Sequence, residues 1–259
     1  MKKTNPPPVE AIAAGRDKKL TIWGHLDELR RRLFRAAIAL VLASGLGFWL
    51  APRIFHFFLR PMEVLGLRPV FIDVTEMLAT YFHIALMAGF AMALPVLLYE
   101  VLMFTLPGLT SRERRYVYVL LPSATFLFIF GLLFSNFVLL PPAFRFLLTF
   151  GSDIAEPQIR IGNYINVVTR LMFWTAVIFE TPLMMVFFAK IGLVSYRGFA
   201  RWRRWVLVLA FVVGALVTPT MDPINQTLVA IPVIFLYELG IWVSWLVARN
   251  VEPRKFKRG

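Results

Sequence analysis

The sequence predicts an all-α integral membrane protein with six transmembrane helices and both termini on the cytoplasmic side. Hydrophobic residues make up 59% of the 259-residue chain and the mean hydropathy is +0.70, which is more apolar surface than a soluble fold of this size can bury. Residues 116–144 form a run of 29 without one charge. Residues 77–99 form a run of 23 in which His83 is the only side chain that could be cationic. Because lipid offers backbone amides no partner, each span should be a helix.

Six apolar segments follow one another along the chain. The fifth has about 12 to 14 apolar residues, or roughly 20 Å of helix, against a hydrocarbon core about 30 Å thick. The bilayer is therefore expected to thin there, or partners to cover the mismatch. Residues 143–150 are expected to form a short helix lying in the membrane interface. The expected spans cover roughly residues 36–50, 78–105, 117–139, 171–189, 206–217 and 224–246.

Local signals mark the ends of several spans. Gly108 follows the second span and Gly192 the fourth, where a helix favours a residue with left-handed backbone angles. Asp222 followed by Pro223 is typical of an N-cap with proline at the first helical position. The sixth span should therefore begin at this pair.

The distribution of Lys and Arg predicts the orientation. Nine precede the first span, three lie at 107–115, five at 190–204 and five from 249 onward, which places 22 of the 28 on one side. The positive-inside rule puts that side, with both termini, in the cytoplasm. The net charge of +13 is therefore a topology signal, and no nucleic-acid partner is expected. We expect residues 1–20 to be a disordered cytoplasmic N-terminus, 21–248 the six-helix membrane domain and 249–259 a basic cytoplasmic tail.

Motifs of catalysis are missing. The chain has no cysteine, no Gly-x-x-x-x-Gly-Lys phosphate loop, no His-Glu-x-x-His and no Gly-x-Ser-x-Gly, and its three histidines stand far apart. The sequence therefore predicts that the protein is not an enzyme and has no cofactor or metal site. Energy for any transport must come from elsewhere.

Acidic residues inside the expected spans are costly and need an explanation. Glu180 stands ten residues from both Arg170 and Lys190, near mid-bilayer, where an acid costs several kcal/mol. It is either a functional group facing protein or water, or a protonated carboxyl hydrogen-bonded to a neighbouring helix, with packing as its only role. For Glu100 and Glu238, nearer the cytoplasmic ends of their spans, structural and functional roles both stay open.

Gln226 is a polar residue about one turn into the sixth span. A polar group near lipid invites a partner transmembrane helix. The alternative is a hydrogen bond to Thr218 across the tight turn between the last two spans. Both interpretations stay open.

The stretch HLDELRRRLF at 25–34 places acids and arginines directly before the first span. On a helix, Asp27 pairs with Arg31 and Glu28 with Arg32, each at i,i+4 with the acid first, worth a few tenths of a kcal/mol per pair. This local pairing is a sufficient structural account of the two acids taken alone.

Glu113 likewise has a local explanation, because it fits a capping box with Thr110 for the third helix. Glu28 and Glu113 together are more specific. They are two carboxylates at the cytoplasmic ends of neighbouring spans, both among arginines, and such a surface could hold a guanidinium through paired hydrogen bonds.

Four motifs resemble the TatC family, the core subunit of the twin-arginine (Sec-independent) protein translocase. The resemblance covers about residues 23–245. The motifs are HLDELRRRL at 25–33, FTLPGLTSRERR at 104–115, FETPLMMVFFAKIGLVS at 179–195 and TLVAIPVIFLYELGI at 227–241.

This resemblance implies a six-helix protein shaped like a cupped hand. The implied function is to bind twin-arginine signal peptides of folded precursor proteins at the cytoplasmic face. Export would then proceed with single-span TatA and TatB partners and further copies of the chain, driven by the proton-motive force across the cytoplasmic membrane. The resemblance assigns signal binding to Glu28, Glu113, Arg30, His25, Phe104 and Leu109, an intramembrane polar role to Glu180, and partner-helix contact to Gln226 and Thr218.

Two other functions remain as alternatives. An ion-coupled secondary transporter would use Glu180 as a proton carrier, but it would leave the two cytoplasmic acids unexplained. A membrane scaffold without a transport role is the other alternative. Preference for an Arg-Arg over a Lys-Lys peptide would separate both from a signal receptor.

Overall fold

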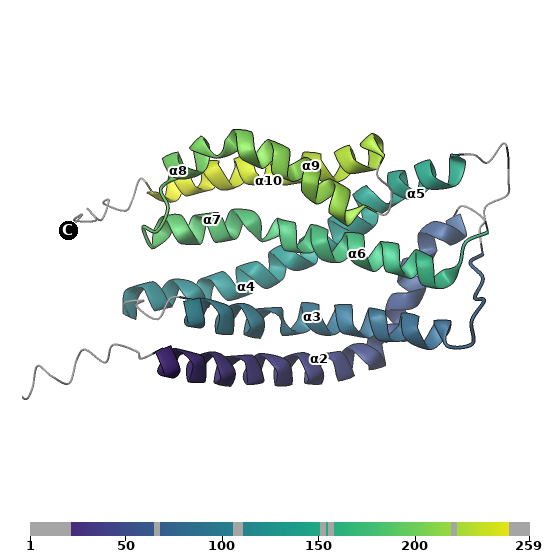
Figure 1. Cartoon of the computed structure of the whole chain (residues 1–259), viewed down its shortest axis with the longest axis horizontal. Helices are drawn as coiled ribbons and strands as arrows, with labels where there is room; N and C mark the ends of the chain where they lie inside the picture. The colour runs from purple at the N-terminus through teal and green to yellow at the C-terminus, as the bar shows by residue number, and fades with distance from the viewer. Residues whose placement is uncertain are drawn as a thin grey trace, which may run out of the picture.

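The computed structural model describes residues 22–64, 68–105, 111–150, 154, 158–218 and 222–248. Within these residues, every secondary-structure element that the structure names is a helix (Figure 1). The predictions for the N-terminal segment, the basic tail and Gly108 lie outside these residues. The helices are α2 (Ile22–Val64), α3 (Glu76–Thr105), α4 (Ser111–Phe134), the π-helical η1 (Ser135–Leu139), α5 (Leu140–Thr149), α6 (Ile161–Phe179), α7 (Thr181–Lys190), α8 (Tyr196–Arg201), α9 (Arg203–Val217) and α10 (Pro223–Ala248).

Five helical segments of the described chain are long and apolar enough to cross a membrane. They are Gly24–Arg60, Glu76–Phe104, Tyr116–Thr149, Ile161–Lys190 and Pro223–Val247. The prediction of six spans is not confirmed, because the expected fifth span is α9, which has 15 residues and a length of roughly 22 Å. The end caps are confirmed where the structure describes them. Gly192 has φ +75°, and Asp222 Oδ1 accepts from the Asn225 amide at 2.8 Å directly before α10.

One expected boundary is wrong. The fourth span was expected to begin at residue 171, directly after Arg170, but α6 begins at Ile161, ten residues earlier. The expected interfacial helix at 143–150 is α5, which continues from α4 through the π-helical turn of η1 without a break. Its Leu140, Ala143 and Phe144 are buried, and Leu140 and Phe144 belong to the main core. The two prolines stand near the start of α5, where their missing amides cost little.

The helices form an elongated bundle (Figure 1). The first and last described residues, Ile22 and Ala248, lie at the same end, called the terminal end below. α2 packs along α3, α4 packs on both α3 and α6, and α10 packs on α7 and α9. The α9–α10 pair therefore lies on the side of the bundle remote from α2 (Figure 1).

Small residues let the helix backbones approach closely, as is common between membrane helices. A Cβ added to Gly89 of α3 would lie 2.5 Å from the Cα of Ser44 on α2, and one added to Gly47 would lie 2.4 Å from the Ala85 carbonyl oxygen. α2 and α3 are therefore in backbone contact near their middles.

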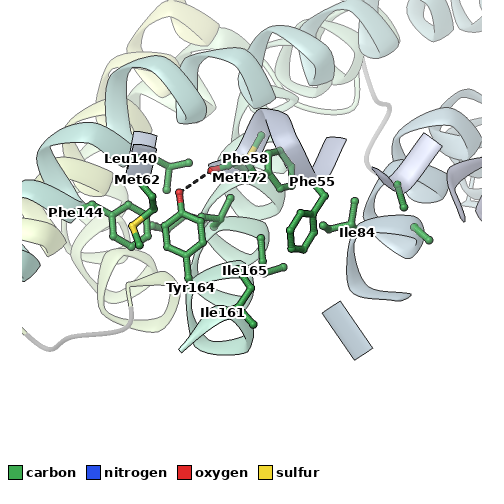
Figure 2. Close-up of a cluster of buried hydrophobic side chains, with 14 of the residues drawn as sticks. Phe55, Phe58, Met62, Ile84, Leu140, Phe144, Ile161, Tyr164, Ile165 and Met172 are labelled. Atoms are coloured by element: carbon green, nitrogen blue, oxygen red, sulfur yellow. Dashed lines mark hydrogen bonds between the residues drawn. The ribbon is translucent and has the colours of Figure 1, made fainter. Parts of the chain in front are cut away.

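The main core lies toward the end opposite the termini (Figure 2). It is built from side chains of α2, α3, α5 and α6, and Tyr164 at its centre is 2% exposed. The Tyr164 hydroxyl donates to the Phe58 carbonyl oxygen at 2.7 Å, so its one polar group is paired. The residues labelled around it are Phe55, Phe58, Met62, Ile84, Leu140, Phe144, Ile161, Ile165 and Met172.

A network of hydrogen bonds and ion pairs centred on Glu76 and Arg160, called the clasp below, lies at the end of the bundle opposite the termini. The Glu76 carboxylate accepts from the Gly162 amide at 2.7 Å, from the Ile72 amide at 3.0 Å and from Arg160 Nε at 2.9 Å, and Arg160 also bonds Asp73. The hydrogen bond to Glu76 raises the pKa of Arg160 above its ordinary value, so the guanidinium stays charged. The clasp holds residues 70–76 against the start of α6.

Candidate functional site

The first turns of α2 and the last turns of α3 meet at the terminal end. His25 of α2 stacks on Phe104 of α3, with ring centroids 4.4 Å apart and an interplanar angle of 21°. Both residues belong to the predicted binding set, and the structure brings them together although 79 positions separate them.

A charged network lies beside this ring pair. Arg32 Nη2 is 2.5 Å from Glu28 Oε1, and Arg32 Nη1 is 3.0 Å from Glu100 Oε2. Arg35 approaches the other oxygen of Glu100 at 3.8 Å. The guanidinium of Arg32 is thus shared between two carboxylates, one from each helix. The fixed planar fork of arginine makes this possible, because its two nitrogens point to different acceptors.

The exposure of the two carboxylates differs in a way that matters for binding. The Glu100 side chain is 7% exposed, whereas that of Glu28 is 22% exposed. Glu28 is therefore the acid of this network that a ligand can reach. Glu100 is too buried to contact a ligand, and it serves as the counter-charge of Arg32.

One prediction about the neighbouring charges needs correction. The pair Glu28–Arg32 is confirmed, but Arg31 donates through Nε to the backbone carbonyl of Asp27 at 3.3 Å and not to its carboxylate. Arg30 is exposed and stands two residues from Glu28, which points the two side chains about 200° apart on the helix. Arg30 therefore faces away from the network, and its part in signal binding stays a prediction.

The second half of the predicted acidic pair is only partly visible. Glu113 belongs to the first turn of α4, at the terminal end, but its side chain lies outside the described residues, as does Leu109 altogether. Only residues 106–110 separate α3 from α4, so the backbone of Glu113 lies at the same end of the bundle as Glu28.

Sequence reasoning did not include Glu100 in the site. Its role was left open because it was treated as an isolated acid near the end of a span. Glu100 stands four residues before Phe104, so both face the same side of α3. Since Phe104 was already in the predicted set, this spacing was a signal that could have found Glu100.

Glu238 belongs to a different ion pair. Its Oε1 lies 2.8 Å from Arg203 Nε, with side chains 37% and 52% exposed. This contact joins α10 to the start of α9 and supports the structural interpretation of Glu238. Such an exposed pair contributes little to stability.

Glu180 lies at the junction of α6 and α7, two residues before Pro182. It is 8% exposed, and within the described chain neither of its carboxyl oxygens has a hydrogen-bond partner. The structural interpretation required a hydrogen bond to a neighbouring helix, and the described residues do not supply one. Glu180 therefore remains a buried polar group that local packing does not explain.

Two side chains cap the C-terminal end of α9, and a third bonds its interior. Thr218 Oγ1 donates to the Gly214 carbonyl at 2.8 Å, and Arg170 donates to the Leu216 carbonyl. A helix end leaves carbonyls without partners, and lipid cannot satisfy them. This capping explains how so short a helix can end within the bundle. Gln226 Nε2 donates to the Phe211 carbonyl at 2.7 Å, a bond that joins α10 to α9 and that neither of the two interpretations of Gln226 included.

We expect Gln226→Leu to lower the stability of the protein by about 0.5–1.5 kcal/mol, because the hydrogen bond that joins α10 to the Phe211 carbonyl of α9 is lost. Thermal unfolding in detergent measures the change. Thr227→Val is the matched control, since the Thr227 hydroxyl donates to the Pro223 carbonyl of its own helix. Equal melting temperatures for the two variants would contradict a role of Gln226 in joining α10 to α9 and favour partner contact.

No group of three or more potential ligands among His, Asp and Glu could hold a metal ion in the part of the chain that the structure describes. Where α2 meets α3 at the terminal end, the described polar side chains form a network of carboxylates and guanidiniums with an aromatic pair beside it. The chemistry that this arrangement supports is recognition of a cation through hydrogen bonds.

Comparisons with known proteins agree across sequence and structure. Residues 24–232 match the family model described as Sec-independent protein translocase protein (TatC). The chain is 33% identical over 240 residues to the protein of that name from Carboxydothermus hydrogenoformans. This alignment covers 93% of this chain and 97% of the relative. It is 36% identical over 235 residues to the one from Aquifex aeolicus, with 87% and 95% covered.

The similarity extends to a chloroplastic relative and to a solved structure. A chloroplastic Sec-independent protein translocase protein of Arabidopsis thaliana is 36% identical over 234 residues, covering 90% of this chain and 68% of the relative. A crystal structure described as the twin arginine translocase receptor TatC superposes with a TM-score of 0.76 at 35% identity, covering 87% of this chain and all of the other.

Proposed function

The chain belongs to the TatC family of Sec-independent protein translocase components, and on this premise we propose that it is the receptor that binds twin-arginine signal peptides for export of folded precursors. The observation that carries the proposal is the Glu28 carboxylate, accessible at the terminal end and already bound to a guanidinium in the resting protein. A site that holds one arginine fork can hold another.

The distribution of basic residues supports placing the terminal end in the cytoplasm, where precursors are made. We take α9 as the fifth of six spans, with the bilayer thinned around it, since its end is capped from within the bundle. Both termini would then lie in the cytoplasm. If the chain is bacterial, the protein would reside in the cytoplasmic membrane.

Recognition would proceed by exchange of guanidiniums. An arginine of the signal binds Glu28 and displaces Arg32, which stays neutralised by Glu100. The second arginine of the signal binds Glu113. Arginine is favoured over lysine, because only the planar fork makes two parallel bonds to one carboxylate. The stacked pair of His25 and Phe104 offers an aromatic surface beside the charges.

The later steps involve groups deeper in the membrane. The apolar part of the signal would enter the concave face toward Glu180, whose carboxyl has no partner among the described residues. Single-span TatA and TatB partners would contact the region of Thr218 and Gln226. Both residues already bond backbone carbonyls of α9, so a partner helix there would meet a surface on which these carbonyls have donors. Transport would be driven by the proton-motive force.

The test measures binding of a fluorescent signal peptide to the purified chain in lipid nanodiscs. We expect an Arg-Arg peptide to bind at least about tenfold more tightly than its Lys-Lys form. The double variant Glu28→Gln with Glu113→Gln should lose this preference. Glu63→Gln, an exposed acid near the opposite end of α2, is the matched control and should retain it.

Equal binding of the two peptides, or unchanged binding by the double variant, would exclude the receptor function. A secondary transporter or a scaffold would give the first of these results.

A further inference from the structure

A polar groove crosses the membrane-facing surface between α3 and α6. Its volume is about 360 Å³, and its polar lining is made by His83, Asn166, Thr169 and Arg170. Three of these side chains, those of His83, Asn166 and Arg170, are exposed. Polar groups on a lipid-facing surface are costly, so they need a polar partner.

The groove lies below the headgroup region but within reach of it. The helical segment Ile161–Lys190 has 30 residues, or roughly 45 Å, and extends about 7 Å beyond each side of a hydrocarbon core about 30 Å thick. Arg170 lies nine residues, or roughly 14 Å, from Ile161, so its Cα stands roughly 7 Å inside the boundary at the end opposite the termini. His83 lies seven residues from Glu76, at a similar depth. A long arginine side chain reaches headgroup phosphates from there.

The charge of the groove is not compensated within the described residues. Arg170 donates one hydrogen bond to the Leu216 carbonyl and forms no ion pair with any described carboxylate. No acidic side chain lines the groove, so the ammonium of a zwitterionic headgroup would find no counter-charge there. A headgroup with net negative charge fits better.

An apolar cavity adjoins the groove. Its volume is about 410 Å³, within the range of pockets that hold small organic groups, and it is lined by apolar side chains of α2, α3, α4 and α6 and by Thr125. Met87 lines both the groove and the cavity. A cationic groove within side-chain reach of the headgroups, with an apolar cavity beside it on the other side of Met87, is complementary to an amphiphile with an acidic head and a hydrocarbon chain.

We propose that this groove binds an anionic phospholipid, with the phosphate on Arg170 and His83 and an acyl chain in the apolar cavity lined by Met87. In the orientation proposed above, the lipid belongs to the outer leaflet. The site lies on the membrane-facing surface between α3 and α6, whereas the signal site lies at the terminal end, so lipid binding does not depend on signal recognition.

The test uses the full chain in detergent and native mass spectrometry with added dioleoyl phosphatidylglycerol or dioleoyl phosphatidylcholine. We expect the unmodified protein to retain one phosphatidylglycerol about fivefold more tightly than phosphatidylcholine, the preference that one arginine near a headgroup supplies. Arg170→Gln should abolish the preference, because it removes the cation of the groove. Arg170→Lys should keep it.

Two further variants make the outcome decisive. Arg53→Gln removes a cation of α2 that does not line the groove and should bind lipid as the unmodified protein does. The double variant His83→Leu with Asn166→Leu leaves Arg170 and its bond intact and should weaken phosphatidylglycerol binding severalfold, so the proposal stays testable if Arg170→Gln does not fold. Absence of a lipid preference in the unmodified protein, or its persistence in the groove variants, would overturn the proposal and favour a partner helix as occupant. No signal peptide is used, so failure here is separate from failure of the receptor function.

Discussion

Replacing Gly89 with alanine is expected to destabilise the protein by about 3 kcal/mol or more, because overpacking here meets backbone atoms. The new Cβ would lie 2.4 Å from Ser44 Oγ, 2.5 Å from its Cα and 2.6 Å from its amide nitrogen. A side chain could rotate away, but the backbone of α2 can yield only if the two helices separate. The change is measured as the midpoint of thermal unfolding in detergent.

Gly45→Ala is the matched control for this prediction. Gly45 lies on α2, one residue from Ser44, and an added Cβ there would meet no atom within 4 Å. We expect this variant to be as stable as the unmodified protein or slightly more stable, since alanine favours helix. Equal stability of Gly89→Ala and Gly45→Ala would show that α2 and α3 do not pack through this contact.

The Gly89 variant also has a functional consequence. The Glu28–Arg32–Glu100 network exists only because α2 and α3 run side by side. Separation of the helices at Gly89 should therefore weaken signal-peptide binding, although Gly89 lies eleven residues, or roughly 16 Å, from Glu100.

The second large effect is expected for Glu100→Gln, which should weaken binding of the Arg-Arg peptide about tenfold, or about 1.4 kcal/mol. Glu100 is too buried to contact the peptide, at 7% side-chain exposure. In the variant, Glu28 is the one carboxylate near Arg32 among the described side chains. Displacing Arg32 would leave a largely buried guanidinium without a counter-charge, so the peptide competes less well.

A double variant separates this exchange from simple damage to the fold. Arg32→Gln combined with Glu100→Gln removes the competitor together with its counter-charge, so Glu28 becomes free and binding should recover to the unmodified level. Glu238→Gln is the matched control, because it breaks another acid–arginine pair, with Arg203, and should leave binding unchanged. Binding by Glu100→Gln at the unmodified level, or a double variant as weak as the single one, would contradict the exchange.

The helices themselves were predictable to within a few residues where their ends carry local signals. The second span was expected at 78–105 and is Glu76–Thr105, and the sixth was expected at 224–246 and is Pro223–Ala248. The pair Glu28–Arg32 was also predictable, because i,i+4 spacing on one helix decides it. The error at Arg170 arose because a cation was taken to mark the edge of a span.

What the sequence by itself determined is the all-helical class, the succession of apolar segments and the caps at Gly192 and Asp222. Lipid imposes helix on any long apolar run, and a cap depends only on residues within one turn. The tertiary structure alone decided that Arg32 is shared with Glu100, 68 positions away, and that Arg170 of α6 caps α9. Such bonds depend on which helices become neighbours, and that choice follows from the packing of small residues and side chains across the whole bundle.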